Sequence, residues 1–169
     1  MVKPQTPPPL APDLLDRVRA RFQDFPPTRA WGLALDALEP GRARLSLAPS
    51  VHTVNGPSGV FNGGVLASLV DLGCALALCT RFDGRMPFAT SDLHIRYLEP
   101  ADAPLTVAAA VVRASPRSAI LECQLLCGDR LVALGTAHFT IQQEVPGERE
   151  AGAPLKGGTA CSLRSRGSP

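Results

Sequence analysis

A single carboxylate inside a long apolar run is the feature that most limits how this chain can fold. In the segment VFNGGVLASLVDLGCALALCT, residues 60–80, Asp71 is the only ionisable acid or base apart from two thiols. Burying a lone carboxylate in an apolar helix is costly unless other groups satisfy it or a ligand uses it. The carboxylate therefore points either to specific partners or to a functional site.

The same segment has the periodicity of a helix with two unlike faces. One face is an apolar stripe at i, i+4, i+7 and i+11, formed by Val65, Leu69, Leu72 and Leu76. The other face carries small residues around the carboxylate: Gly64, Ala67, Ser68, Asp71 and Ala75. Small residues let a second backbone or a slender ligand approach closely. We therefore expect a site on this face, with Asn62 and Gly63 at the start of the helix.

Three plainer interpretations of the segment stay open at this stage. It has about the 20 residues that a transmembrane helix needs, but a central Asp costs about 3 kcal/mol on insertion scales. It also lacks a strong basic flank on one side. The second interpretation is a core helix whose Asp71 accepts backbone N–H groups. The third is a helix that exposes Asp71 at its edge.

The composition indicates one globular domain and excludes several function classes. The chain has 169 residues, of which 45% are hydrophobic and 19% charged, and a net charge of +2 with few aromatic residues argues against nucleic-acid binding. The N-terminus lacks the apolar core of a signal peptide. The five cysteines form no C-x-x-C pair, which favours reduced thiols and a cytoplasmic protein. The scattered histidines, at 52, 94 and 138, argue against a zinc site.

The order of predicted elements indicates an α+β fold. We expect a helix over 13–24 that Pro26 and Pro27 stop, strands over 30–38 and 43–47, and a loop over 49–59 before the long helix. Strands follow over 88–98, 104–114, 118–127 and 131–141. The prediction is a long antiparallel sheet wrapped around one central apolar helix. It places the domain at residues 13–142, between a Pro-rich disordered segment, 1–12, and a disordered tail, 143–169.

This order and the residues at the start of the long helix resemble the hotdog-fold acyl-CoA thioesterases, and most closely the phenylacetate-degradation group. That group carries His-Gly-Gly with an Asp nine residues after the His. Asn62 takes the place of the His here, Asp71 lies nine residues on, and Gly59 stands three residues before Asn62. Asn55 matches an upstream Asn after a one-residue insertion. The strand TSDLHIRYLEPA, residues 90–101, is also similar, and the resemblance covers roughly residues 30–142.

The resemblance implies a thioesterase that hydrolyses a medium-chain or aryl acyl-CoA to the free acid and CoA. Asp71 would be the general base or the nucleophile, the backbone N–H of Gly63 the oxyanion donor, and Asn62 an added side-chain donor. Thr90 would position water, although it is equally a plain strand residue. The residues expected to bind substrate are Asn55, Gly64, Ser68, Ser91, Arg113 and Arg117. In this set Ser91 replaces Thr90 if the register slips by one, and the two arginines either hold CoA phosphates or are only solvated.

The resemblance also implies partners. Gly63 and Asp71 lie two helical turns apart, roughly 10 Å, so they cannot reach one carbonyl oxygen from the same chain. In hotdog dimers the site lies between subunits, which implies a homodimer or a dimer of dimers, a homotetramer. The implied partner is the acyl-CoA substrate, with no nucleic acid or membrane. No metal or cofactor is implied, because coenzyme A is part of the substrate.

Two other functions remain open on the same scaffold. A non-catalytic acyl-CoA-binding protein is favoured by Asn62, because an amide can donate a hydrogen bond to a carbonyl but cannot titrate. A hotdog hydratase or dehydratase normally pairs a His with an acid near this helix, and Asn62 removes the obvious His.

Overall fold

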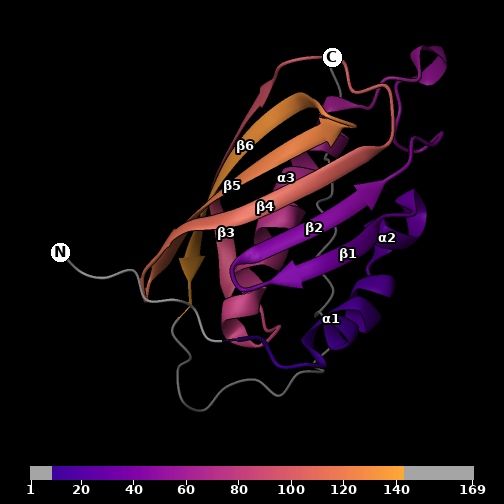
Figure 1. Ribbon diagram of the computed structural model, residues 1–169. Helices are drawn as coiled ribbons and strands as arrows, with labels where there is room; N and C mark the ends of the chain where they lie inside the picture. The colour runs from indigo at the N-terminus through magenta and orange to yellow at the C-terminus, as the bar shows by residue number, and fades with distance from the viewer. Residues whose placement is uncertain (1–8, 143–169) are drawn as a thin grey trace, which may run out of the picture.

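Nine helices and strands make up the fold in residues 9–142, which are the residues that the computed structural model describes (Figure 1). In chain order they are α1 Leu14–Gln23, α2 Pro26–Trp31, β1 Ala34–Glu39, β2 Arg42–Leu47, α3 Gly63–Cys79, β3 Phe88–Tyr97, β4 Leu105–Ala114, β5 Ser118–Cys127 and β6 Arg130–Ile141. Single 3-10 turns lie at Gly56–Ser58 and Thr80–Phe82. The predictions made for residues 1–8 and 143–169 lie outside the described residues.

One six-stranded antiparallel sheet curls around α3. Its strand order is β1-β2-β4-β5-β6-β3, so β1 and β3 form the two edges. Figure 1 shows the sheet crossing over the long helix, with α1 and α2 beside β1. The α+β prediction, with an antiparallel sheet around one central helix, is confirmed.

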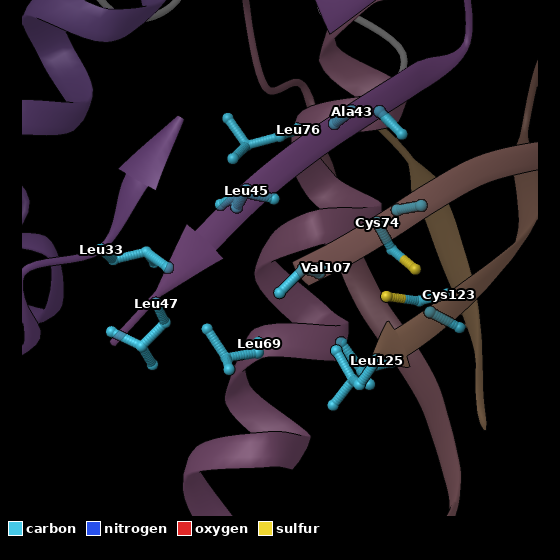
Figure 2. Packing of buried hydrophobic residues seen from close by; sticks show 14 of the residues in the cluster. Leu33, Ala43, Leu45, Leu47, Leu69, Cys74, Leu76, Val107, Cys123 and Leu125 are labelled. Atoms are coloured by element: carbon cyan, nitrogen blue, oxygen red, sulfur yellow. The ribbon is translucent and has the colours of Figure 1, made fainter. Parts of the chain in front are cut away.

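The alternation of the strands decides which side chains form the core. In β5 the predicted inward set is buried: Ala119, Leu121, Cys123, Leu125 and Cys127. Figure 2 shows Leu69 and Leu76 of α3 among buried side chains of β2, β4 and β5. The stretch Gly63–Phe82 is long and apolar enough to span a membrane, but most of it is buried within this protein. Packing against the sheet therefore accounts for its composition.

Two glycines let α3 approach the sheet closely. A Cβ added to Gly135 of β6 would lie 2.3 Å from Cγ1 of Val70, a residue with 0% exposure. A Cβ added to Gly73 of α3 would lie 2.9 Å from Cγ1 of Val107 in β4. Both distances are shorter than real Cβ contacts, so the helix sits at this depth only because both positions lack a side chain.

The structure corrects the predicted start of the first strand. Residues Ala30 and Trp31 belong to the short helix α2, and the strand begins at Ala34. Pro26 does not simply stop the first helix; it begins the second, because proline suits the first position of a helix. Gly32, with φ of 72°, then ends α2 in the left-handed conformation.

The sheet does not cover α3 on every side. Leu72 is only half-buried, whereas the other members of the predicted apolar stripe are buried. Along the small-residue face, Gly64 and Ser68 are exposed in this chain. In a single chain the sheet therefore leaves one face of the helix open, and this is the face that carries Asp71.

Candidate active site

The start of α3 is built by two asparagine side chains. Asn62 is the N-cap residue, and its Oδ1 accepts a 2.8 Å hydrogen bond from the N–H of Gly64. Its Nδ2 donates to Oδ1 of Asn55 at 2.9 Å. These bonds fix the orientation of the Asn62 amide. One of its two amide hydrogens is left for another acceptor.

Gly63, the first residue of the helix, keeps its N–H unpaired. In residues 9–142 no hydrogen bond from this N–H occurs, and the first N–H groups of a helix lie at its positive end. The carbonyl of Gly63 accepts a 2.8 Å hydrogen bond from the hydroxyl of Tyr97. A Cβ on Gly63 would lie 3.4 Å from the Tyr97 ring. Gly63 is thus held through its carbonyl, while its N–H, which belongs to the peptide that joins it to Asn62, is available for a ligand.

Asp71 is paired with a hydroxyl of the neighbouring edge strand. The Oγ1 of Thr90 in β3 donates to Oδ1 of Asp71 at 2.7 Å. Asp71 is half-buried on the open face of α3. One carboxylate oxygen is therefore engaged, and a carboxylate has further acceptor capacity on its second oxygen.

The alternative register, with Ser91 beside the carboxylate, is not the one observed. A bulge in β3 falls between Thr90 and Asp92. Ser91 donates instead to the carbonyl of His138 at 3.0 Å, and its hydroxyl lies 3.3 Å from Nδ1 of the same residue. The structure thus brings Thr90, and not Ser91, to Asp71.

The small-residue face links the helix start to Asp71. Ser68 uses its hydroxyl within the helix, since its Oγ donates to the carbonyl of Gly64 at 2.9 Å. Ala67 and Ala75, on the same face, are half-buried. No bulky side chain of α3 stands between Gly64 and Asp71 on this face, so a slender ligand or another chain can lie along it.

Gly63 and Asp71 contact different positions of β3 and are not brought together in one chain. Tyr97 at the end of the strand contacts Gly63, whereas Thr90 near its start contacts Asp71. Because β3 is an edge strand, one side of it has no neighbouring strand among residues 9–142. The two groups therefore serve one carbonyl only if a second copy supplies one of them.

Arg113 lies near the end of β4, and Arg117 lies in the turn that leads to β5. Each is exposed, and within the described residues neither guanidinium makes a hydrogen bond or an ion pair. The carbonyl of Arg117 accepts from the N–H of Ile141, and Ile141 pairs with Phe88 at the start of β3. The β4–β5 turn is thus at the end of the sheet where β3 begins.

The cysteines are core residues. All four in the described residues are buried and free: Cys74, Cys79, Cys123 and Cys127. The thiol of Cys74 lies against that of Cys123 (Figure 2), and this contact and burial raise the pKa of Cys74. Cys74 is an enclosed core residue, and its burial and the contact with Cys123 disfavour the thiolate, which is the nucleophilic form of a cysteine.

Tyr97 is the one contact residue of this site that the sequence pattern does not reveal. It is the only tyrosine of the chain and lies seven residues after Thr90 on the same strand. Its side chain reaches the start of α3 because β3 runs beside the helix. Only the arrangement of the two elements shows this contact.

Within residues 9–142, no group of three or more metal-ligating side chains occurs.

A family model described as Thioesterase superfamily matches residues 58–134. These residues include α3, β3, β4 and β5, and thus Gly63, Asp71, Thr90 and Tyr97. No curated protein matches the chain.

Solved structures share this fold. A conserved protein of Pseudomonas aeruginosa is 30% identical with a TM-score of 0.65, covering 72% of this chain and 97% of that chain. A variant of the phenylacetic acid degradation protein PaaI of Thermus thermophilus is 28% identical with a TM-score of 0.63, covering 69% and 99%. The PaaI protein of the E. coli phenylacetic acid degradation operon is 20% identical with a TM-score of 0.70, covering 79% and 96%, and shows the fold alone.

Proposed function

The chain belongs to the thioesterase superfamily and has the hotdog fold, and from this premise we propose that it is an acyl-CoA thioesterase. It hydrolyses a medium-chain or aryl acyl-CoA to the free acid and CoA. The observation that carries the proposal is the pair formed by Asp71 and Thr90 on an open, small-residue helix face.

Asp71 activates water in this mechanism. Its free carboxylate oxygen accepts a proton from water, and the hydroxide forms a bond to the thioester carbonyl carbon. The tetrahedral intermediate then expels the CoA thiolate as the C–S bond breaks, and the thiolate takes up the proton. Asp71 can instead attack the carbonyl itself to give a mixed anhydride that water hydrolyses. Thr90 holds the carboxylate in both routes.

Gly63 stabilises the oxyanion. Its unpaired N–H at the positive end of α3 is the kind of donor that stabilises negative charge developing on a carbonyl oxygen. The Tyr97 hydroxyl holds the Gly63 residue through its carbonyl, on the peptide that follows the N–H. The remaining amide hydrogen of Asn62 is a second donor, and Asn55 orients that amide.

A homodimer completes the site, because Gly63 and Asp71 cannot reach one carbonyl from a single chain. In the part of the chain that the structure describes, one edge of β3 has no neighbouring strand. This edge and the open face of α3 both carry site residues, so a second copy placed there brings Gly63 of one subunit to Asp71 of the other. The dimer-of-dimers arrangement is part of the same proposal.

The positively charged side chains near the start of β3 are the proposed binding site for the CoA moiety. Arg113 and Arg117 have no partner among the described residues and are available for the phosphates of CoA. Gly64 and Ser68 line the path along the helix between the two ends of the site. The 28% identical relative named for phenylacetic acid degradation makes phenylacetyl-CoA one member of the substrate panel.

The test is thiol release from acyl-CoAs, from acetyl to octanoyl and phenylacetyl, by wild type, Asp71→Asn and Asp92→Asn. Asp71→Asn keeps the shape of the side chain but removes the base, so turnover is lost while fold and dimer are kept. Asp92→Asn removes an exposed carboxylate of β3, the strand that carries Thr90, and leaves turnover intact. Full turnover by Asp71→Asn removes Asp71 from the mechanism. Saturable binding without any turnover in wild type favours the non-catalytic binding protein.

A further inference from the structure

Strand β3 has a long free edge, and its side chains are open to water on both faces of the sheet. The strand is 10 residues long, and every side chain except those of Phe88 and Ile95 is exposed. Leu93, Tyr97 and the following Leu98 are 37%, 53% and 49% exposed. Among residues 9–142 no strand lies beside this edge. Such an edge pairs with another chain unless something blocks it, and exposed apolar surface favours the pairing.

The side chains of β3 alternate between two faces of the sheet. The hydroxyl of Tyr97 donates to Gly63 of α3, so Tyr97 lies on the helix face. After the bulge, the helix face therefore carries Leu93, Ile95 and Tyr97, and the outer face carries Asp92, His94 and Arg96. In residues 9–142, neither the Asp92 carboxylate nor the Arg96 guanidinium makes a hydrogen bond or an ion pair. These two opposite charges are therefore free to pair with another chain.

Pairing of β3 with a second copy of itself allows few registers. In an antiparallel pair, residues directly opposite each other point to the same face of the sheet. A two-fold axis between two residues would oppose side chains of different faces, so the axis passes through a residue. Near the middle of the exposed stretch, the axis can pass through Leu93, His94 or Ile95.

The candidate active site distinguishes these registers. Tyr97 contacts Gly63 in the same chain. Thr90, which precedes the bulge of β3, contacts Asp71. Gly63 of one copy therefore meets Asp71 of the other when Tyr97 of one strand lies opposite the bulge of the other.

An axis at His94 meets this condition. It places Tyr97, three residues after the axis, opposite Ser91, three residues before it on the partner strand. Ser91 is the residue of the bulge that follows Thr90. An axis at either of the other two residues shifts this position by two residues, away from the bulge.

The same axis also pairs opposite charges. It places Asp92 opposite Arg96 of the partner subunit, twice in each dimer, and Leu93 opposite Ile95 of the partner subunit on the helix face. The two other axes place His94 opposite either Asp92 or Arg96, and form no carboxylate–guanidinium pair. Opposite-charge and apolar cross-strand pairs both stabilise a sheet. The site geometry and the charge pattern thus favour one register independently.

We propose that β3 pairs antiparallel with β3 of a second copy of this chain, with the two-fold axis at His94. The Asp92 and Arg96 pairs set this register, and the register brings Gly63 of one subunit to Asp71 of the other. The inference rests on the proposed function, because it uses the condition that these two groups act on one carbonyl. Asp92 and Arg96 are thus positioning residues that act through the dimer.

Cross-linking of single cysteines measures the register. His94→Cys places two thiols opposite each other, with Cβ atoms about 4.5–5.5 Å apart, close to the separation in a disulfide. Asp92→Cys or Arg96→Cys alone leaves equivalent thiols four residues out of register, about 13 Å apart. Co-expression of these two variants places their thiols opposite each other. All variants carry Cys161→Ser, because the other four cysteines are buried.

The cross-linked products are separated by non-reducing electrophoresis after oxidation with copper phenanthroline. We expect a disulfide-linked dimer for His94→Cys and for the co-expressed pair, and monomer for Asp92→Cys or Arg96→Cys alone. Efficient cross-linking of either of the latter two alone, or none of His94→Cys, overturns the register.

Charge reversal tests whether Asp92 and Arg96 set the register. Asp92→Arg and Arg96→Asp each place like charges opposite each other twice in a dimer, so each is expected to raise the dimer dissociation constant about tenfold. The double variant Asp92→Arg/Arg96→Asp exchanges the charges and restores association. Arg44→Asp, at an exposed position of β2 away from this edge, leaves it unchanged. The neutral Asp92→Asn adds no repulsion and stays dimeric. Sedimentation velocity over a concentration series measures these constants.

These measurements do not depend on turnover. Wild-type association of both single reversals, a double variant no better than they are, or a monomeric wild type overturns the proposal. A dimer that cross-links at His94 but releases no thiol supports the register while the proposed function fails. Turnover by a dimer that cross-links elsewhere supports the function and overturns the register.

Discussion

The hydroxyl of Thr90 and the carboxylate of Asp71 are joined by a 2.7 Å hydrogen bond that ties edge strand β3 to the central helix. The two residues lie 19 positions apart in the chain, and the bond determines how the half-buried carboxylate is oriented. Because it engages Oδ1, Oδ2 is left for water or substrate. In the proposed mechanism the hydroxyl therefore positions the carboxylate.

Replacing Thr90 with Val, which keeps the shape but removes the hydroxyl, is expected to lower kcat. Positioned acid–base groups contribute about 10²–10⁴-fold, and loss of the orienting bond removes a part of this, about tenfold. KM changes little because Thr90 acts through Asp71. Thr90→Ser restores most of the rate. Steady-state kinetics with the best acyl-CoA of the panel measures both parameters.

Ser91→Ala is the matched control for Thr90→Val, since its hydroxyl contacts His138 and not Asp71. Its kcat is expected to equal that of wild type. A larger loss in Ser91→Ala than in Thr90→Val contradicts the assignment.

Tyr97→Phe tests whether the hydrogen bond to the Gly63 carbonyl is needed to hold this residue in place. The variant keeps the ring that packs at Gly63 but loses the hydroxyl that donates to the Gly63 carbonyl. We expect kcat to fall several-fold and the free energy of unfolding to fall by about 1 kcal/mol, as for one hydrogen bond. Kinetics and urea denaturation measure the two effects. A loss of stability with unchanged kcat makes Tyr97 purely structural.

Arg113→Ala with Arg117→Ala tests the proposed phosphate contacts. Because charged hydrogen bonds contribute about 1.5–3 kcal/mol, KM for an acyl-CoA is expected to rise about tenfold or more. KM for the matching acyl-pantetheine, which lacks the nucleotide phosphates, stays constant. An equal rise for both substrates is inconsistent with phosphate binding.

Much of the fold could be predicted from local patterns. The alternation in β5 and the long apolar helix each reflect a repeating burial requirement, and both are found where predicted. The sequence pattern does not reveal the second role of Pro26, because a proline that stops one helix also suits the first position of another. The structure distinguishes the two cases, since Pro26 is the first residue of α2.

The candidate site was harder to predict because its contacts join distant elements. Asp71 is conspicuous in the sequence because burying a lone carboxylate in an apolar run costs free energy. Gly63 is conspicuous because it stands at the start of the predicted helix. Thr90 came from a family resemblance. Tyr97 carries no such signal, since an aromatic residue near the end of a strand is ordinary, and its contact with Gly63 depends on how β3 lies beside α3.

Gly135→Ala is expected to destabilise the protein. Its Cβ would lie 2.3 Å from Val70 Cγ1 and 2.8 Å from Cγ2, so α3 or β6 must move. Overpacking of this kind costs about 1–3 kcal/mol. Adding Val70→Ala to Gly135→Ala is expected to recover part of the loss, and Thr136→Ala, the next residue on the outer face, has little effect. Urea denaturation of wild type, Val70→Ala, Gly135→Ala and the double variant gives the coupling, and strict additivity contradicts the clash.

Stability should fall in alkali partly because of Cys79. Burial raises its pKa to about 12, whereas an unfolded thiol titrates near pH 8.5. The folded state therefore holds a proton that the unfolded state loses, so this contribution is present below about pH 8.5 and is lost as the pH rises toward 12. Each thiol contributes at most about 1.4 kcal/mol per pH unit.

Cys79→Ala isolates that contribution, because the other groups that titrate in this range are common to both proteins. Urea denaturation between pH 7 and 11 is expected to show a smaller loss of unfolding free energy in the variant than in wild type. The variant starts from lower stability at pH 7, since a buried thiol and its 3.0 Å hydrogen bond to the Leu76 carbonyl are removed. Parallel curves for the two proteins contradict this prediction. They mean that the Cys79 thiol titrates alike in the folded and unfolded states, despite its 0% exposure in the fold.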